Sequence, residues 1–195
     1  MKPFKILTDD YFIGNIGSIE ATDEIVRVCD RNFLNSSSTQ EGSFVTTEGN
    51  FIVDHRMRKC KTNWIPTNQF NFIEHGLKSI VNNVNRMKWN MDLDNVWESN
   101  IQYTQYTGKG HFYDWHQDAY ASKVELVKGR KISIVYCLSY KTDYVGGEFQ
   151  IKRNDGTTYT RKFNYGDFIV FPSYIMHRVK PLKSGNRTTL VGWYM

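Results

Sequence analysis

The chain has 195 residues, of which 40% are hydrophobic and 23% are charged, and its formal net charge is +5. A chain of this length can bury a sizeable core and usually forms one or two domains. No apolar run approaches the roughly 20 residues that a membrane-spanning helix needs, so we expect no membrane segment. The modest positive charge permits an acidic partner but does not require one.

The three cysteines, Cys29, Cys60 and Cys137, are odd in number and widely spaced. We expect reduced thiols and a cytoplasmic location, because disulfides are rare in that compartment. No Cys-x-x-Cys pair suggests a zinc site. The first ten residues lack the apolar core of a signal peptide.

Residues 1–99 are predicted to be helical and irregular. A helix is expected over 21–30 with Thr22 as its N-cap, and a loop over 35–50, where serine and glycine are frequent. The strongest helix is predicted over 68–89. Six apolar residues lie on one stripe of it, namely Ile73, Leu77, Ile80, Val81, Val84 and Met87. We expect both helices to pack on a sheet.

Residues 100–195 are predicted to be short strands, with turns at 107–110, 154–156 and 184–186. Asp155-Gly156 between two β-prone runs is a strong hairpin signal. Many short strands with regular turns favour a sandwich or jelly roll. With no internal repeat and no linker, we expect one mainly β domain over 1–195. In it, helices would brace a cupin-like double-stranded β-helix.

His116 and Asp118 are separated by one residue in an aromatic stretch. In a strand, side chains two residues apart point to the same face, so both would face one cavity. His177 follows an apolar run that Pro172 interrupts, and it is the candidate for a third ligand. Two imidazoles and one carboxylate hold one face of Fe(II) and leave the remaining positions open.

Arg187 follows the second histidine by ten residues and opens a β-prone run to the C-terminus. Arg187, Thr189, Val191 and Trp193 share one face of that run. An arginine facing a cavity can hold the carboxylate of a co-substrate through a bidentate pair. Each residue alone has an ordinary explanation, such as a core histidine or a surface cation. Their order and separation together favour an iron site.

The C-terminal half resembles the 2-oxoglutarate- and Fe(II)-dependent dioxygenases, and within them the prolyl hydroxylases of the prolyl 4-hydroxylase and oxygen-sensing branches. The matching segments are 106–110, 112–118, 132–138, 146–149, 166–172, 177–179 and 187–193. The resemblance implies that His116, Asp118 and His177 bind iron. It also implies that Arg187 pairs with the far carboxylate of 2-oxoglutarate and that Tyr106 hydrogen-bonds the same group.

Further contacts follow from the resemblance. Trp193 is expected to line the co-substrate and substrate pocket, and Tyr113 to lie near the substrate. Thr189, on the arginine face, could add a hydroxyl to the co-substrate site, although a strand-forming residue there needs no such role. The oxygen-sensing branch has a tyrosine contact where this chain has Cys137, which makes the neighbouring Tyr136 a candidate for that contact.

The implied activity is that of a dioxygenase that hydroxylates a prolyl residue in a protein or peptide. It would use Fe(II), 2-oxoglutarate and O₂, release succinate and CO₂, and have ascorbate as a candidate reductant. Segments 120–129 and 141–145 are candidates for a substrate lip, and solvated loops are the alternative.

Other functions remain open to different degrees. A hydroxylase of a free amino acid or other small molecule uses the same chemistry. A nucleic-acid dealkylase typically carries a second arginine where this chain has Trp193, which argues against a nucleic-acid partner. The complete ligand set argues against a binding module without catalytic activity.

Overall fold

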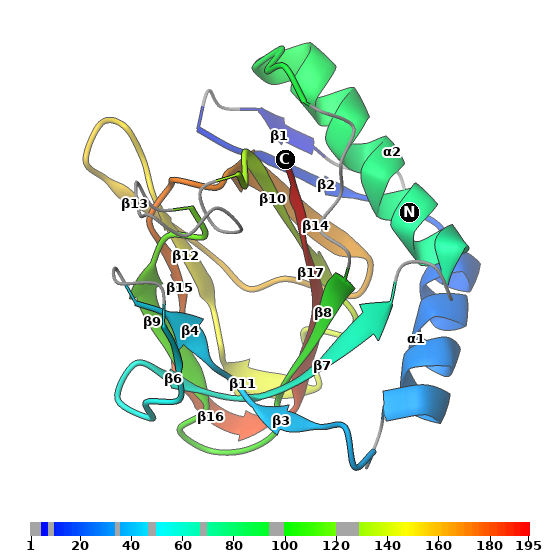
Figure 1. The fold of residues 1–195 in the computed structure, drawn as a ribbon, viewed down its shortest axis with the longest axis vertical. Coiled ribbons are helices and arrows are strands. Elements are labelled where there is room, and N and C mark those ends of the chain that lie inside the picture. Colours follow the sequence, from blue (N-terminus) through cyan, green and yellow to red (C-terminus); the bar gives the residue numbers. More distant parts are fainter. Residues whose placement is uncertain are drawn as a thin grey trace.

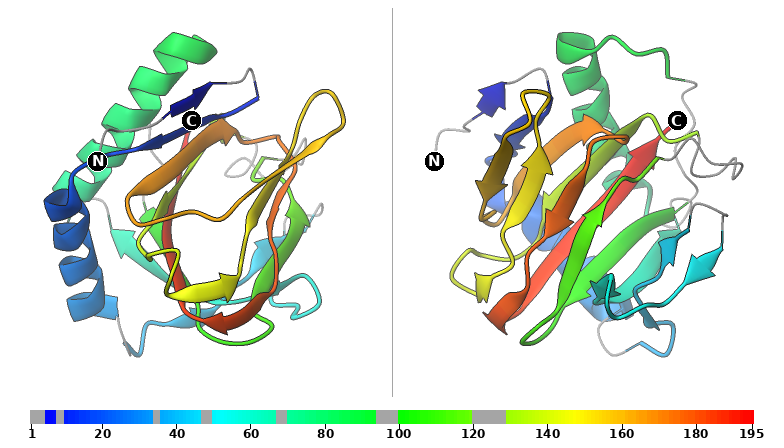
Figure 2. Two further views of the ribbon diagram at one scale, coloured as in Figure 1. Left: turned by 180° about the vertical axis from the view of Figure 1, so that it is seen from behind. Right: turned by 90° about the vertical axis from the view of Figure 1, so that its left-hand side faces the viewer.

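The computed structural model describes residues 5–7, 10–33, 36–46, 50–66, 70–93, 100–119 and 129–195. Its central feature is a pair of antiparallel sheets that face each other, with two helices packed on the outer side of one (Figures 1 and 2). This is the predicted double-stranded β-helix, a jelly roll.

The larger sheet has the order β1-β2-β14-β10-β17-β8-β7-β3. Its strands are β1 (Lys5–Leu7), β2 (Phe12–Asn15), β14 (Asp167–Pro172), β10 (Ile132–Cys137), β17 (Arg187–Tyr194), β8 (Asn100–Tyr106), β7 (Lys61–Pro66) and β3 (Gln40–Glu41). Three of its central strands, β10, β14 and β17, come from the C-terminal half, and the N-terminal strands extend both edges.

The smaller sheet has the order β13-β12-β15-β9-β6. Its strands are β13 (Thr158–Arg161), β12 (Phe149–Lys152), β15 (His177–Val179), β9 (Phe112–His116) and β6 (Arg58–Lys59). Two further antiparallel pairs are β11 (Tyr144–Gly146) with β16 (Leu182–Gly185), and β4 (Phe44–Val45) with β5 (Phe51–Ile52). The chain crosses repeatedly between the two main sheets, and this winding gives the double-stranded β-helix.

Helices α1 (Ile19–Phe33) and α2 (Asn71–Lys88) lie beside the larger sheet (Figure 1). Strand β10 is buried on both faces because it separates two cores. Ile132, Ile134 and Tyr136 pack toward the helices, whereas Val135 and Cys137 pack between the sheets. Alternation along one strand therefore assigns neighbouring residues to different cores.

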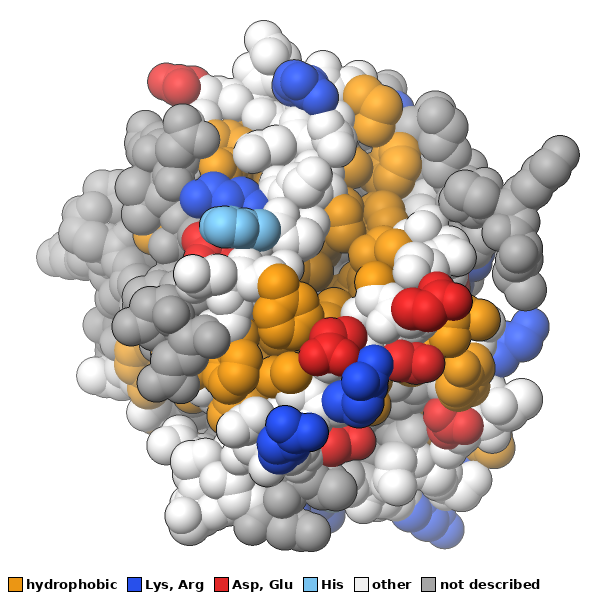
Figure 3. All heavy atoms as spheres, turned by 90° about the vertical axis from the view of Figure 1, so that its right-hand side faces the viewer, with side chains coloured by type: hydrophobic (Ala, Val, Ile, Leu, Met, Phe, Trp, Pro, Cys, Tyr) orange, Lys and Arg blue, Asp and Glu red, His pale blue; other side chains and the backbone are white. Residues whose placement is uncertain are grey.

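The side of the molecule that carries the helices exposes hydrophobic side chains between acidic and basic ones (Figure 3). In the described part of the chain, neither helix has the length and apolar character needed to cross a bilayer. All three cysteines are free and buried.

The expectation for residues 1–99 was incomplete, because this part also contributes strands β1–β7. Most of them are only two to four residues long, and β2, β3 and β6 pair with strands that are distant in the sequence. The predicted N-cap was also wrong. Helix α1 begins at Ile19, and the Ser18 hydroxyl accepts the Ala21 N–H at 3.2 Å, which places Thr22 inside the helix.

Two local predictions are confirmed. Helix α2 buries Ile73, Leu77, Val81 and Val84 as the stripe predicted, although Met87 at its end is exposed. Strands β12 and β13 form the hairpin predicted around Asp155-Gly156. The turn glycine has a φ of +82°, a conformation that most other residues adopt at a cost.

Candidate metal centre and co-substrate pocket

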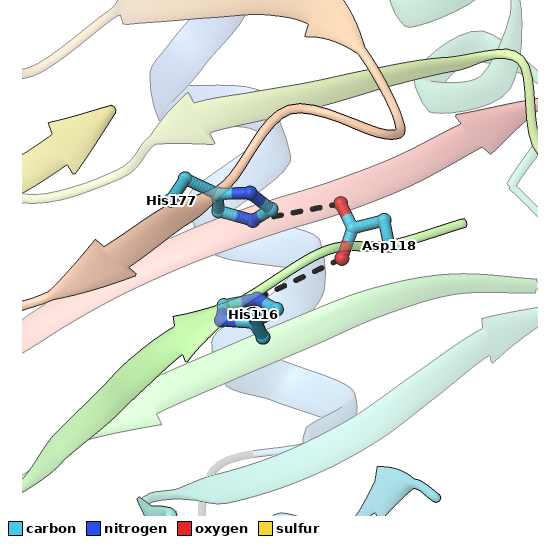
Figure 4. Close-up of side chains that lie close together, drawn as sticks. All are labelled: His116, Asp118 and His177. Carbon is cyan, nitrogen blue, oxygen red and sulfur yellow. Dashed lines mark ion pairs between the residues drawn. The ribbon is translucent and has the colours of Figure 1, made fainter. Parts of the chain in front are cut away.

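His116, Asp118 and His177 converge in the space between the sheets (Figure 4). His116 ends β9 and pairs in register with His177 at the start of β15, while Asp118 lies just beyond β9. The two Asp118 carboxylate oxygens lie 3.7 Å from His116 Nε2 and 3.6 Å from His177 Nε2. All three side chains are buried.

Backbone carbonyls orient both imidazole rings. His116 Nδ1 lies 2.7 Å from the Asp114 carbonyl oxygen, and His177 Nδ1 lies 2.9 Å from that of Ile175. With Nδ1–H donating to these carbonyls, each Nε2 carries a lone pair directed at the common centre.

The Asp118 carboxylate is held in place by strand β10. The Ser133 hydroxyl donates to Asp118 Oδ2 at 2.8 Å and lies 2.8 Å from the Ser173 hydroxyl. Sequence reasoning missed both serines. A fully buried serine between Ile132 and Ile134 in an apolar strand is the signal that could have indicated Ser133.

The electrostatics favour the metal-binding protonation states. Burial, and then the neighbouring His177, hold the pKa of His116 well below its usual value. Burial alone would raise the pKa of Asp118, but His177, His116, Arg130 and the Ser133 hydroxyl outweigh it, so that this pKa is lowered. A neutral imidazole and an ionised carboxylate are the forms that bind a cation.

The donor set fits Fe(II). One ligand atom from each of the three residues lies within 4.8 Å of the others, and no other such group of three was found among the described residues. Two imidazoles with one carboxylate match the ligand preference of non-haem iron oxygenases.

The three ligand residues line one pocket between the sheets. Strand β17 provides the predicted face of Arg187, Thr189, Val191 and Trp193. Across the sheet, β8 provides the residues paired with the first three of these, namely Tyr106, Thr104 and Gln102. Alternating residues of two neighbouring strands thus form one wall.

Arg187 is an unpaired cation inside this pocket. Its side chain is 1% exposed, and Nε, Nη1 and Nη2 have no hydrogen-bond partner in the described part of the chain. Gly147 lets the chain approach it closely, because a Cβ there would lie 3.2 Å from Arg187 Cδ. A buried guanidinium without a counterion is costly, so the arrangement fits the far carboxylate of 2-oxoglutarate.

Tyr106 lies beside Arg187, whose guanidinium carbon is 5.3 Å from the centre of the tyrosine ring. Burial raises the pKa of Tyr106, so its hydroxyl stays protonated and can donate. The Tyr113 ring stacks on His116 with centroids 3.5 Å apart, and Trp193 lies beneath the Arg130 guanidinium at 3.9 Å. Both aromatic residues line the pocket.

Tyr136 does not lie at this site, contrary to the prediction. It points toward the helices, where its hydroxyl lies 2.6 Å from that of Thr22. The neighbouring Cys137 does face the inter-sheet core but is not among the residues that line the pocket. The strand period of two explains the error, because adjacent residues point to opposite faces.

The structure bears on only one part of the predicted substrate lip. Residues 120–128 of the segment 120–129 lie outside the described residues, and none of residues 141–145 lines the pocket. Instead, Phe44 of β4 and Phe51 of β5 contribute to its lining. The apolar run Phe51-Ile52-Val53, which is 39–58% exposed, was the overlooked signal.

Comparisons with known proteins agree with this geometry. Residues 101–195 match the 2OG-Fe(II) oxygenase superfamily. A PKHD-type hydroxylase of Idiomarina loihiensis is 33% identical over 44% of this chain and 37% of its own length. A PKHD-type hydroxylase of Crocosphaera subtropica is 29% identical over 48% of this chain and 41% of its own length. The chain thus spans about two fifths of the length of the curated relatives it matches.

Solved structures extend the likeness in fold to nearly the whole chain. A Trichoplax adhaerens prolyl hydroxylase, solved with a hypoxia inducible factor peptide fragment, has a TM-score of 0.77 and 20% identity, covering 96% of this chain and 84% of its own. A Pseudomonas putida prolyl-4-hydroxylase has a TM-score of 0.66 and 18% identity, covering 95% and 91%. Residues 101–195 thus resemble the 2OG-Fe(II) oxygenase superfamily in sequence, and the chain resembles prolyl hydroxylases in fold.

Proposed function

We propose that this chain is an Fe(II)- and 2-oxoglutarate-dependent dioxygenase that hydroxylates a prolyl residue in a protein or peptide. One oxygen atom of O₂ would enter the product, and the other would enter succinate as 2-oxoglutarate loses CO₂. The observation that carries the proposal is the buried, unpaired guanidinium of Arg187 in the same pocket as the three ligand side chains.

Each part of the chemistry has a group in the pocket. His116, Asp118 and His177 would hold the metal, and bound Fe(II) would supply the activation of O₂. Arg187 and Tyr106 would bind the far carboxylate of 2-oxoglutarate and so orient its 2-oxo acid end toward the ligands. The backbone carbonyls and Ser133 keep the ligand side chains in position without reorganisation.

Part of the pocket lining beside the ligands is apolar. Val135, Phe149 and Val179 contribute apolar surface near the ligands. Phe149 also stacks on His177 with centroids 5.6 Å apart, which restricts the ring. A dry pocket protects a reactive oxidising centre from side reactions, and this is the contribution that the protein makes to cofactor chemistry.

Three features support a prolyl peptide as substrate. Phe44 and Phe51 line the pocket, and Phe51 is 58% exposed, so they offer apolar surface to a bound chain. Trp64 and Trp193, with ring centroids 6.1 Å apart, provide flat walls against which an apolar pyrrolidine ring can pack. The Trichoplax adhaerens structure with a similar fold was solved with a peptide fragment.

The test is succinate formation by the purified protein with prolyl peptides, free amino acids and alkylated DNA. We expect succinate with prolyl peptides and a mass gain of one oxygen on proline. Turnover confined to a free amino acid or an alkylated base would overturn the peptide assignment. Metal-loaded protein that neither binds nor consumes 2-oxoglutarate would overturn the proposed activity itself.

A further inference from the structure

Arg58 is a second buried arginine in the pocket, and the proposed activity gives it no role. Its side chain comes from β6 and is 5% exposed. All of its hydrogen-bond partners are neutral. Nε donates to Cys60 Sγ at 2.9 Å, Nη1 to the Ser43 carbonyl at 2.7 Å and Nη2 to Gln102 Oε1 at 2.7 Å. In the described part of the chain, no carboxylate pairs with it.

The charge balance of the pocket leaves this arginine without a counterion. If the proposed function holds, the charges of Fe(II) and Arg187 are balanced by those of 2-oxoglutarate and Asp118. Arg58 then remains as a further positive charge in the lining. Asp118 is the one carboxylate among the described lining residues, and the balance above already uses its charge, so an anionic ligand would supply the missing counterion for Arg58.

The remaining donors of Arg58 can reach a ligand. A guanidinium has five N–H groups, and the hydrogen bonds described above use three of them. The two that remain belong to Nη1 and Nη2, and each can donate a charge-assisted hydrogen bond to a carboxylate. Arg58 lies among pocket-lining residues and is already held rigidly, so binding an anion costs it little side-chain entropy.

The Tyr113 ring lies in contact with both Arg58 and the proposed metal ligand His116. The Arg58 guanidinium carbon lies 4.4 Å above the centre of the Tyr113 ring, and that ring stacks on His116 with an interplanar angle of 13°. An anionic group held by Arg58 would therefore sit one aromatic ring away from a metal ligand. A substrate whose reacting carbon lies at the metal could therefore place a neighbouring carboxylate against Arg58.

We infer that Arg58 binds a carboxylate of the primary substrate and so makes this enzyme selective for acidic substrates. This inference rests on the proposed function, in which the carboxylate would belong to an acidic side chain next to the target proline. The free carboxylate of an amino acid has the same chemistry, and the test below separates the two sources.

The test compares ligands that differ only in charge. Binding is followed through tryptophan fluorescence, because Trp64 and Trp193 line the pocket, with Fe(II) and 2-oxoglutarate present and O₂ excluded. One pool of prolyl peptides carries Asp or Glu beside proline, and a matched pool carries Asn or Gln. L-proline and L-prolinamide form the second pair. We expect one acidic member to bind at least tenfold tighter than its amide, as a charge-assisted pair implies.

Variants assign the preference to Arg58. Arg58→Gln should reduce the acid-to-amide ratio to within about twofold, while binding of the amide stays close to that of the wild type. Arg58→Lys, which keeps the charge but loses the fork, should give an intermediate ratio. The matched control is Arg56→Gln, two residues away, because Arg56 is an exposed residue paired with Asp54 at 2.8 Å. That control should keep the full ratio.

The wild-type protein alone can overturn the inference, even if the variants at Arg58 fail to fold. Equal affinities within both ligand pairs would exclude a carboxylate subsite, and so would a preference that survives Arg58→Gln. A peptide preference assigns the carboxylate to a side chain, and a proline preference assigns it to a free amino acid. Binding of 2-oxoglutarate in the absence of substrate is recorded separately, so failure of the proposed function is recognised independently.

Discussion

Arg187 and Tyr106 are paired across β17 and β8, and the guanidinium carbon lies 5.3 Å from the centre of the phenol ring. Both side chains face the inter-sheet pocket, and both are at least 97% buried from solvent, with exposures of 1% and 3%. A fixed cation beside a protonated hydroxyl would suit a carboxylate ligand, as the proposed function requires.

Arg187→Ala should weaken 2-oxoglutarate binding by a factor of at least about 100, because loss of a buried charge partner costs about 3–5 kcal/mol. Calorimetric titration of the metal-loaded protein measures this affinity. Without 2-oxoglutarate, the free energy of unfolding should not fall, since the substitution removes an unpaired buried cation. Arg178→Ala, which breaks the surface pair with Asp114, is the control. Unchanged affinity in Arg187→Ala would place the carboxylate elsewhere.

Tyr106→Phe should weaken 2-oxoglutarate binding, whereas Tyr136→Phe should lower the stability of the fold. Loss of the Tyr106 hydroxyl should weaken 2-oxoglutarate binding by about 1–2 kcal/mol, as expected for a hydrogen bond to a charged group. Loss of the Tyr136 hydroxyl removes its contact with Thr22 and should lower the free energy of unfolding by about 1 kcal/mol, without changing the affinity. Denaturant unfolding and calorimetry separate the two. If Tyr136→Phe bound 2-oxoglutarate more weakly than the wild type, Tyr136 would be part of the co-substrate site after all.

The sequence was sufficient for those parts of the site that depend on strand periodicity. Arg187 and Thr189, two residues apart on β17, share a face as this period requires. His116 and Asp118 do converge, but Asp118 lies beyond the end of β9, so the strand period alone does not place its carboxylate. Tyr136 and Cys137 show the limit of this reasoning, because deciding which of two neighbours faces the pocket requires knowledge of which core lies on which side. That follows from where helix α1 packs, which is a long-range contact.

The jelly-roll class was predictable from short strands and turn signals, whereas the edges of the sheets were not. Strands β3 to β6 have two residues each, and β3 and β6 pair with distant segments. Such strands have little local preference of their own, since pairing and burial decide β-structure. Arg58 went unnoticed for the same reason, because only its place on β6 brings it to Tyr113.

Asp118→Ala and His177→Ala should each abolish stabilisation by the metal while leaving the fold intact. A ligand present at 100 times its dissociation constant raises the free energy of unfolding by about 2.7 kcal/mol in a protein that binds it. Anaerobic thermal unfolding with and without Fe(II) would reveal this increment in the wild type. Asp114→Asn is a matched control, because its carboxylate faces Arg178 rather than the ligands. Equal increments in Asp118→Ala and the wild type would refute the ligand assignment.

The three cysteines should resist alkylation in the folded protein at pH 8. Burial raises the pKa of Cys137 to about 11 and that of Cys29 to about 12, and it also raises the pKa of Cys60. A thiol reacts as its thiolate, and this form becomes abundant only as the pH approaches the raised pKa. Intact-mass measurements with iodoacetamide should show no adduct until guanidinium unfolds the chain. Rapid labelling of native Cys137 would contradict its placement.

Ser133→Ala should weaken metal binding without removing a ligand. The Ser133 hydroxyl donates to Asp118 Oδ2 and is also paired with Ser173, so its loss leaves the carboxylate less well oriented and Ser173 short of a partner. Groups that hold a ligand in this way typically contribute a factor of about 10–100 in metal affinity.

Competition with a metal chelator measures the affinity of Ser133→Ala for Fe(II) under anaerobic conditions. Ser133→Thr keeps the hydroxyl and should retain more of the affinity if its added methyl is accommodated. Ser184→Ala, on exposed β16, controls for the general effect of losing a serine hydroxyl. If Ser133→Ala bound Fe(II) as tightly as Ser184→Ala, the carboxylate would be oriented by the backbone alone. The hydrogen bond from Ser133 would then have no part in building the metal centre.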